Sequence, residues 1–107
     1  TKNNYMKMLI VNSIKEDLQA VQQLFEEAKI PVFSVSETVG HKTEHSNDLL
    51  NNWFAKGDVS TESLFFFSFT SDIKANEGLQ LIKIYNQNNP SNFPLRAFLL
   101  PVEDCSY

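Results

Sequence analysis

The chain has one cysteine, three glycines and one tryptophan among its 107 residues. Cys105 has no second cysteine to pair with, so the sequence excludes an internal disulfide and a thiolate cluster that would bind zinc. The simplest interpretation of Cys105 is a free thiol near one end of the chain. A lone thiol also favours a reducing, cytoplasmic compartment over an oxidising one.

Basic residues are few as well. Nine Lys and Arg stand against 13 Asp and Glu, which gives a net charge of −4. The basic residues are dispersed, whereas a surface that binds DNA or RNA needs them clustered to displace counterions from phosphates. We therefore expect no nucleic-acid partner.

Long apolar runs are absent too. The longest runs, such as Met8–Val11 and Leu64–Phe67, are far shorter than the roughly 20 residues that span a bilayer. The chain also opens without a charged and then apolar signal peptide. We therefore expect a cytoplasmic protein that is not an integral membrane protein.

Apolar residues are nevertheless sufficient for a core. They make up 42% of the chain, and nine of them are Phe. This composition excludes a disordered tail, and the length suits one domain rather than two. We expect a single domain over residues 1–107 with its core in residues 6–102.

The first third of the chain predicts a strand, a helix and a second strand. Apolar side chains alternate over Met6–Ile14, as in a strand. Ser13 and Glu16 form the Ser-x-x-Glu pattern of a capping box, and an amphipathic helical stripe follows them. Residues then alternate again over Val32–Val39, which predicts the second strand.

The rest of the chain repeats the order strand, helix, strand after a polar insertion. A polar insertion at residues 41–61 separates the second strand from a third one at Glu62–Thr70. A weaker helical pattern covers Ile73–Tyr85, and an Asn-rich loop follows at residues 86–94. The last strand is predicted at Leu95–Val102, with a break at Pro101.

The order βαββαβ predicts an α+β fold, the ferredoxin-like plait, in which two helices cover one face of a four-stranded antiparallel sheet. In this topology the first and third strands are central, and these two strands are apolar on both faces. Pro94 and Pro101 fall in the last strand, which the topology places at an edge where a missing N–H is tolerated.

Two helices leave the second face of such a sheet open. If Leu9, Val11, Leu64 and Phe66 lie on that open face, they form an exposed apolar patch. A patch of this kind usually marks an interface. We therefore expect a homo-oligomer whose sheets close on one another.

Two segments resemble the PII signal-transduction family. They are Met6–Val11, before the first helix, and Val35-Ser36-Glu37-Thr38-Val39-Gly40, before the polar insertion. The resemblance implies a homotrimer with its sheets around a central axis. It also implies a regulatory role through a small ligand or through a protein partner such as a transporter or an enzyme. The related CutA-like trimers share this architecture.

The resemblance also places a ligand or partner site at the insertion, with Glu37, Gly40, Trp53 and Phe54 as its candidate residues. Trp53 and Phe54 are either anchors for a partner or a small satellite core that fixes the insertion to the body; helical spacing favours the satellite core. The usual ATP-binding loop of the family is glycine- and lysine-rich. Residues 86–94 contain neither residue type and include two prolines, so we expect no ATP at that site.

His41, Glu44 and His45 lie close together in the insertion and are the candidate ligands of a divalent metal, zinc or copper. The alternative is that both imidazoles are exposed and bind nothing. Metal binding would make the protein a CutA-like metal-binding trimer, and a third alternative is a structural assembly subunit. We see no catalytic motif and expect no enzymatic activity.

Overall fold

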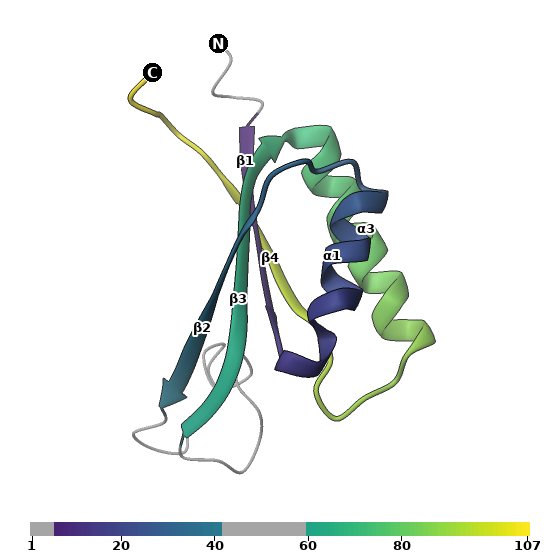
Figure 1. Cartoon of the computed structure of the whole chain (residues 1–107). Coiled ribbons are helices and arrows are strands. Elements are labelled where there is room, and N and C mark those ends of the chain that lie inside the picture. Colours follow the sequence, from purple (N-terminus) through teal and green to yellow (C-terminus); the bar gives the residue numbers. More distant parts are fainter. Residues whose placement is uncertain (1–5, 42–59) are drawn as a thin grey trace.

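The computed structural model describes residues 6–41 and 60–107, with the backbone alone for residues 60 and 61. Figure 1 shows the sheet with both helices on one side of it. In chain order the elements are β1 (Met6–Ser13), the 3-10 helix η2 (Lys15–Asp17), α1 (Leu18–Glu27), β2 (Ser34–His41), β3 (Ser60–Ser71), α3 (Asp72–Asn88) and β4 (Arg96–Pro101).

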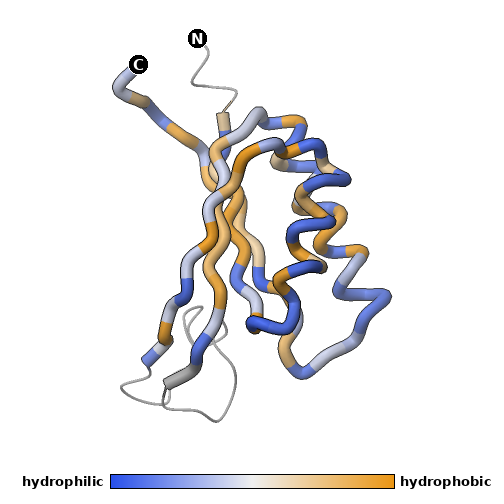
Figure 2. The backbone as a smooth tube through the Cα atoms, viewed as in Figure 1, coloured by the Kyte–Doolittle hydropathy of each residue, from blue (hydrophilic) through white to orange (hydrophobic). Residues whose placement is uncertain are grey.

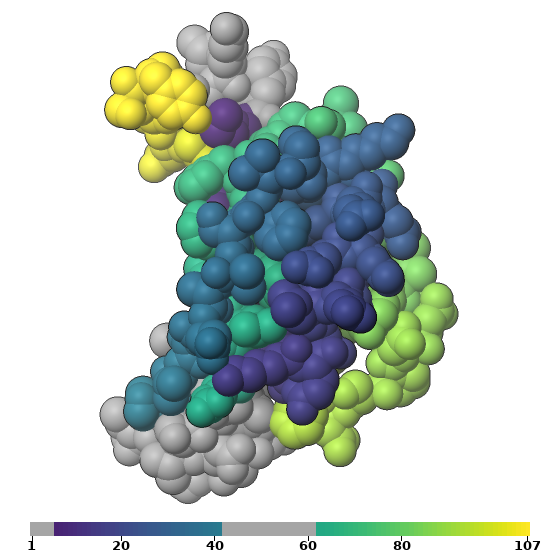
Figure 3. Space-filling model, viewed as in Figure 1, coloured from purple at the N-terminus to yellow at the C-terminus, as the bar shows by residue number. Residues whose placement is uncertain are grey.

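The sheet has the predicted ferredoxin-like topology. Its strand order is β2-β3-β1-β4, and all three pairings are antiparallel. The strands that are apolar on both faces, β1 and β3, are central, and β4 with Pro101 is at an edge, as expected. In the space-filling view, the last turns of α3 lie beyond α1, on the side away from β2 (Figure 3).

The assignment of the two faces from the sequence was wrong. Leu9, Val11 and Phe66 are fully buried and Leu64 is nearly so, because these four residues face α1 and α3 and form the core. We call this side of the sheet the covered face. The other side, which carries Met8, Ile10 and the remaining phenylalanines of β3, is the open one. Figure 2 shows apolar residues along the middle of the central strands, with polar residues toward their ends.

Aromatic rings fill the core between α1 and the sheet. The ring of Phe25 on α1 lies 4.9 Å from that of Phe33 and 6.1 Å from that of Phe66, both edge-on. Such edge-to-face pairs add about 0.5–1.5 kcal/mol each beyond the burial of their area. This cluster therefore fixes α1 over β3.

Helix α3 packs on the sheet through small residues, Ala75 and Gly78, with Ile82 one turn further on. A Cβ atom at Gly78 would lie only 2.9 Å from Cδ2 of Leu9. Glycine here therefore lets the helix approach β1 more closely than any larger residue would.

The starts of the two helices are capped differently. Ser13 ends β1 and its hydroxyl donates to the carbonyl of Ile14, so the predicted capping box does not form. At α3, by contrast, the hydroxyl of Ser71 accepts a hydrogen bond from the N–H of Lys74, 3.3 Å away, as a true N-cap.

Helix α1 ends in a Schellman motif. The N–H of Ile30 donates to the carbonyl of Phe25, and the N–H of Lys29 donates to that of Glu26. Lys29 takes the left-handed position, with φ of 60°. The motif turns the chain so that Ile30 packs back into the core.

The ladder between β2 and β3 continues to the pair His41 and Ser60. The predicted insertion, residues 41–61, is therefore shorter, because β2 includes residue 41 and β3 includes residues 60 and 61. Helix α3 extends to Asn88, into the predicted loop at residues 86–94. None of the helices in the described residues is long and apolar enough to cross a membrane.

Candidate functional site

The uncovered side of the sheet carries a continuous row of large apolar side chains. The pairing register places Met8 opposite Phe69 and Leu100, and Ile10 opposite Phe67 and Phe98. Residues directly opposite one another in antiparallel strands share a face. We call this surface the open face; its residues are Met8, Ile10, Phe65, Phe67, Phe69, Phe98 and Leu100.

The phenylalanines of β3 form a ladder along the open face. The ring centroids of Phe65 and Phe67 are 5.7 Å apart, and those of Phe67 and Phe69 are 6.2 Å apart. Phe69 remains 55% exposed and Leu100 41% exposed. No helix among the described residues covers these side chains, and Phe69 and Leu100 in particular are left exposed.

A polar row borders the open face. Asn12 is opposite Phe65 on one side and Arg96 on the other. Its amide donates to Oγ of Ser63 at 3.0 Å and to the carbonyl of Leu64 at 3.2 Å. The next residue of β3 on the same face, Ser63, is polar as well, so the apolar surface ends near Asn12.

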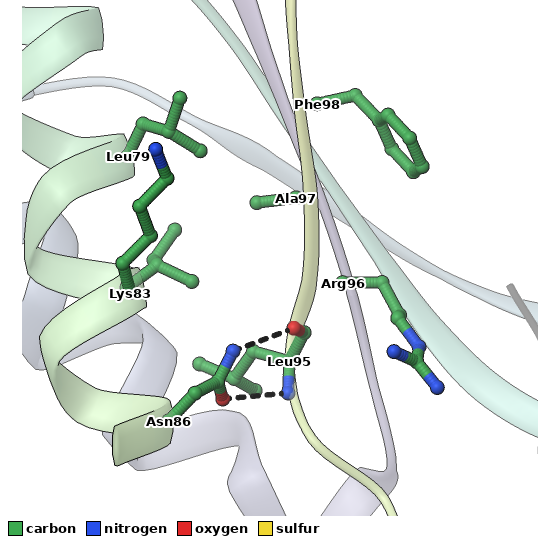
Figure 4. A pocket seen from close by; sticks show the side chains of 8 residues that line it. Leu79, Lys83, Asn86, Leu95, Arg96, Ala97 and Phe98 are labelled. Carbon is green, nitrogen blue, oxygen red and sulfur yellow. Dashed lines mark hydrogen bonds between the residues drawn. The ribbon is translucent and has the colours of Figure 1, made fainter. Parts of the chain in front are cut away.

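A hollow of about 350 Å³ lies between α3 and β4. Figure 4 shows Leu79 and Lys83 on α3 and Ala97 on β4 facing one another across it. Arg96 and Phe98 point away from α3, to the other side of β4, as the alternation of a strand requires. The two cationic residues of the hollow therefore do not converge on one point.

Asn86 closes one end of this hollow. Its side-chain amide donates to the carbonyl of Leu95 at 2.9 Å, and its side-chain oxygen accepts from the N–H of Leu95 at 3.0 Å. Figure 4 draws both bonds. A single side chain thus satisfies both backbone groups of the residue that precedes β4.

An ion-pair network joins the start of the helical layer to β2 and β3. Nζ of Lys15 lies 2.8 Å from Oε1 of Glu37 and 3.0 Å from Oε2 of Glu62. The hydrogen bonds to these two carboxylates, followed by their charges, raise the pKa of Lys15 to about 12. The hydrogen bond and charge of Lys15 in turn lower the pKa of Glu37.

Of the predicted loop-site residues, two lie in the described part of the chain. Glu37 is on β2 in the network with Lys15, and Gly40 is a buried residue of the same strand. Trp53 and Phe54 lie outside the described residues. Whether these four residues form one site stays a prediction.

Of the predicted metal ligands, His41 is the exposed last residue of β2, and Glu44 and His45 lie outside the described residues. Within residues 6–41 and 60–107, no three His, Cys, Asp or Glu side chains come together in a group that would hold a metal. The proposed set needs Glu44 and His45, so it also stays a prediction.

Sequence reasoning missed the hollow, the double hydrogen bond of Asn86 and the true composition of the open face. Asn86 was assigned to a loop, whereas it belongs to the last turns of α3. The open face depends on register, which pairs Ile10 with both Phe67 and Phe98. The sequence does show that β1 and β3 each have two apolar rows. It does not show which of the two rows the helices cover.

Comparison with known proteins gives no match by sequence and clear matches by structure. No known protein-family signature matches the chain, and no curated protein matches it significantly. A DUF3240 family protein from Shewanella baltica has a TM-score of 0.63 at 12% identity, with 96% of each chain covered.

Two structures of GlnK from B. subtilis are also similar. One has a TM-score of 0.59 at 11% identity, covering 90% of this chain and 85% of GlnK. The other, a complex of GlnK with ATP, has a TM-score of 0.57 at 12% identity, covering 91% and 84%. At these identities the comparison establishes fold alone: the chain has a ferredoxin-like α+β fold of the PII-like kind.

Proposed function

We propose that the protein is a PII-like regulatory module that works as a homotrimer and binds a small ligand or a protein partner, such as a transporter or an enzyme. The observation that carries the proposal is the open face. Three copies packed with these faces toward a common axis would remove the apolar side chains from water. Burial of such surface is worth about 25 cal/mol per Å².

We propose a binding role in the cytoplasm rather than catalysis. The comparison with GlnK concerns fold, and the proposal of a non-enzymatic role rests on the lack of a catalytic motif in the sequence. We place the ligand or partner site at the end of β2, where Glu37 and Gly40 lead into the segment with Trp53 and Phe54.

We propose further that the protein does not bind ATP in the usual PII manner. The connection between α3 and β4, residues 89–95, has neither Gly nor Lys, and Pro90 and Pro94 lack backbone N–H groups. A phosphate cradle depends on successive backbone N–H groups and benefits from positive charge. These residues supply little of either.

Light scattering coupled to gel filtration tests the assembly. We expect a trimer at micromolar concentration, and a monomer for Phe67→Asp, which buries a charge in the proposed interface. Ile84→Asp is the matched control, because Ile84 is 50% exposed on α3, away from the open face. It should remain trimeric. Circular dichroism must show that both variants fold; a monomeric wild-type protein would end the proposal.

A thermal-shift screen tests the ligand. A compound that binds the folded state alone raises the melting temperature by mass action. Nucleotides and other small metabolites form one arm of the screen, and stabilisation by ATP would contradict the absence of a phosphate cradle.

Divalent metals form the second arm, because the CutA-like alternative rests on His41, Glu44 and His45. Stabilisation by zinc or copper that disappears in the His41→Ala, His45→Ala double variant would favour that alternative. Stabilisation that persists in the double variant would exclude these residues as the ligands.

A further inference from the structure

We propose that Lys15 is an ionic lock, a single ammonium group that bridges Glu37 of β2 and Glu62 of β3 and so keeps the end of β2 paired with its neighbour. The lock joins the start of the helical layer to the strand end in which we place the ligand or partner site. Its use in binding rests on the proposed function, whereas the lock itself does not.

The two carboxylates lie on adjacent strands and on the same face of the sheet. Glu37 is opposite Leu64 in the ladder of β2 and β3, and Glu62 is two residues before Leu64. Two residues along a strand return to the same face, so Glu37 and Glu62 are diagonal neighbours on the covered face. Their negative charges would repel each other across the ladder if no cation lay between them.

Lys15 supplies that cation from a third element, η2. Its Nζ lies 2.8 Å from Oε1 of Glu37 and 3.0 Å from Oε2 of Glu62, both within hydrogen-bonding distance. An ammonium group has three N–H donors, so it serves both carboxylates at once. The hydrogen bonds to these carboxylates, followed by their charges, raise the pKa of Lys15 to about 12. The bridge therefore keeps its positive charge throughout the neutral pH range.

The backbone that carries Lys15 is placed by the central strands. Ser13, the last residue of β1, pairs with Leu64 of β3, which in turn pairs with Glu37 of β2, so these three residues form one line across the sheet. The chain then turns into η2, whose first residue is Lys15. Lys15 therefore starts from a defined point beyond the end of β1 and reaches back across β3 to β2.

The end of β2 contacts little besides β3 in the part of the chain that the structure describes. Just before this strand, the ring of Phe33 lies 4.9 Å from that of Phe25, so the core holds the start of β2. Further on, β2 pairs with β3 alone and is exposed at most positions, including Val39, which is 50% exposed. Figure 1 shows the last residues of β2 well apart from α1 and α3. Within the described residues, the pairing of this end therefore depends on the ladder and on Lys15.

Loss of the lock would open the strand end rather than unfold the domain. Exposed ion pairs contribute little to global stability because solvent screens their charges. The ends of edge strands, however, open locally at a small cost in free energy, so a small local contribution changes the open population severalfold. Removal of Lys15 favours the open state for two reasons: the bridge is lost, and the two carboxylates then repel each other.

Amide hydrogen exchange followed by NMR tests the lock. We expect the protected amides among residues 38–41 to exchange at least about threefold faster in Lys15→Met than in the wild type, and those of α3 to exchange equally in both. Lys7→Met is the matched control, because it removes the ion pair of Lys7 with Asp72 near the opposite end of β1 and should not change residues 38–41. Equal rates in Lys15→Met and the wild type, or no protection in the wild type, would overturn the inference.

Two further variants separate the charge of Lys15 from its packing. Lys15→Arg keeps the charge and should keep the wild-type exchange rates. Adding Glu37→Gln to Lys15→Met removes the repulsion between the carboxylates and should return the rates to within about twofold of the wild type. Fast exchange in either variant would show that Lys15 acts through packing and would refute the lock. The exchange rates need no bound ligand, so they test the lock separately from the proposed function.

Discussion

Phe66 and Phe67 are neighbours in β3, and their rings lie on opposite faces of the sheet. Phe66 is fully buried, with its ring 6.1 Å from that of Phe25 on α1. Phe67 is half-buried on the open face, with its ring between those of Phe65 and Phe69. Consecutive aromatic residues therefore serve two separate surfaces, one inside the domain and one at its exterior.

The first prediction separates these two surfaces. Phe66→Ala should lower the free energy of unfolding by about 3–5 kcal/mol, because it removes a ring from the closed core. Phe67→Ala should lower it by less and should weaken self-association instead. Urea denaturation at low protein concentration measures the first effect, and sedimentation measures the second. Equal losses of stability would contradict the assignment of the two faces.

The second prediction concerns the end of α1. Lys29 holds a left-handed conformation, with φ of 60°, which costs a residue with a side chain about 1 kcal/mol relative to glycine. Lys29→Gly should therefore raise the free energy of unfolding by about 0.5–1 kcal/mol. Gln23→Gly, an exposed position inside the same helix, should lower it by about 1 kcal/mol. A loss of stability in Lys29→Gly would argue against the Schellman motif.

The third prediction concerns the contact of α3 with β1. Alanine at Gly78 would place its Cβ 2.9 Å from Cδ2 of Leu9 and 3.3 Å from Cδ1 of Ile30. Overpacking typically costs about 1–3 kcal/mol, and the better helix propensity of alanine returns about 1 kcal/mol.

Chemical denaturation should therefore show Gly78→Ala slightly less stable than the wild type, by about 1 kcal/mol, and Gly78→Val clearly less stable. Gln80→Ala is the control, on the exposed side of the same helix, and should change little. A more stable Gly78→Ala would mean that Leu9 and Ile30 yield without cost.

The fourth prediction is a pH dependence of the pair Lys15 and Glu37. The pKa of Glu37 is lowered on folding, so its contribution is present above its ordinary value and is lost as the pH falls through the folded value. The pKa of Lys15 is raised to about 12, so its contribution is present below 10.5 and is lost as the pH rises through about 12.

Lys15→Met should therefore lower the melting temperature slightly near neutral pH, with a smaller difference at about pH 3. The effect is small because solvent screens exposed ion pairs. High salt should reduce the neutral-pH difference in the same way. A difference that is unchanged from neutral to acid pH would mean that Lys15 stabilises the protein by packing rather than by charge.

The fold was predictable because strand and helix patterns are local. Alternation over Met6–Ser13 and Ser60–Ser71, and a helical stripe between Leu18 and Glu27, need only the sequence to be recognised. The capping box failed because Ser13 continues the strand: its backbone pairs with Leu64, and its hydroxyl bonds the next carbonyl. Strand pairing, a tertiary interaction, prevailed over a local helix signal.

The candidate site was much less predictable. The order of the elements implied one open face, and the apolar rows implied that it would be apolar. The sequence analysis put the row of Leu9 on the open face, whereas the structure has the row of Met8 there. Both rows of this strand are apolar, so the sequence does not distinguish them. The two hydrogen bonds between Asn86 and the backbone of Leu95 have no signal in the sequence, since they depend on where the last turns of α3 meet β4.

The sequence by itself determined the elements, their order and the two-layer topology, because these depend on local periodicity and on short connections. Only the tertiary structure decided which face of the sheet the helices cover. Alternation divides a strand into two rows, but it does not choose between rows of similar apolarity. The choice is made by shape: Gly78 lets α3 approach Leu9, and Phe25 of α1 meets Phe66, so the second row remains outside.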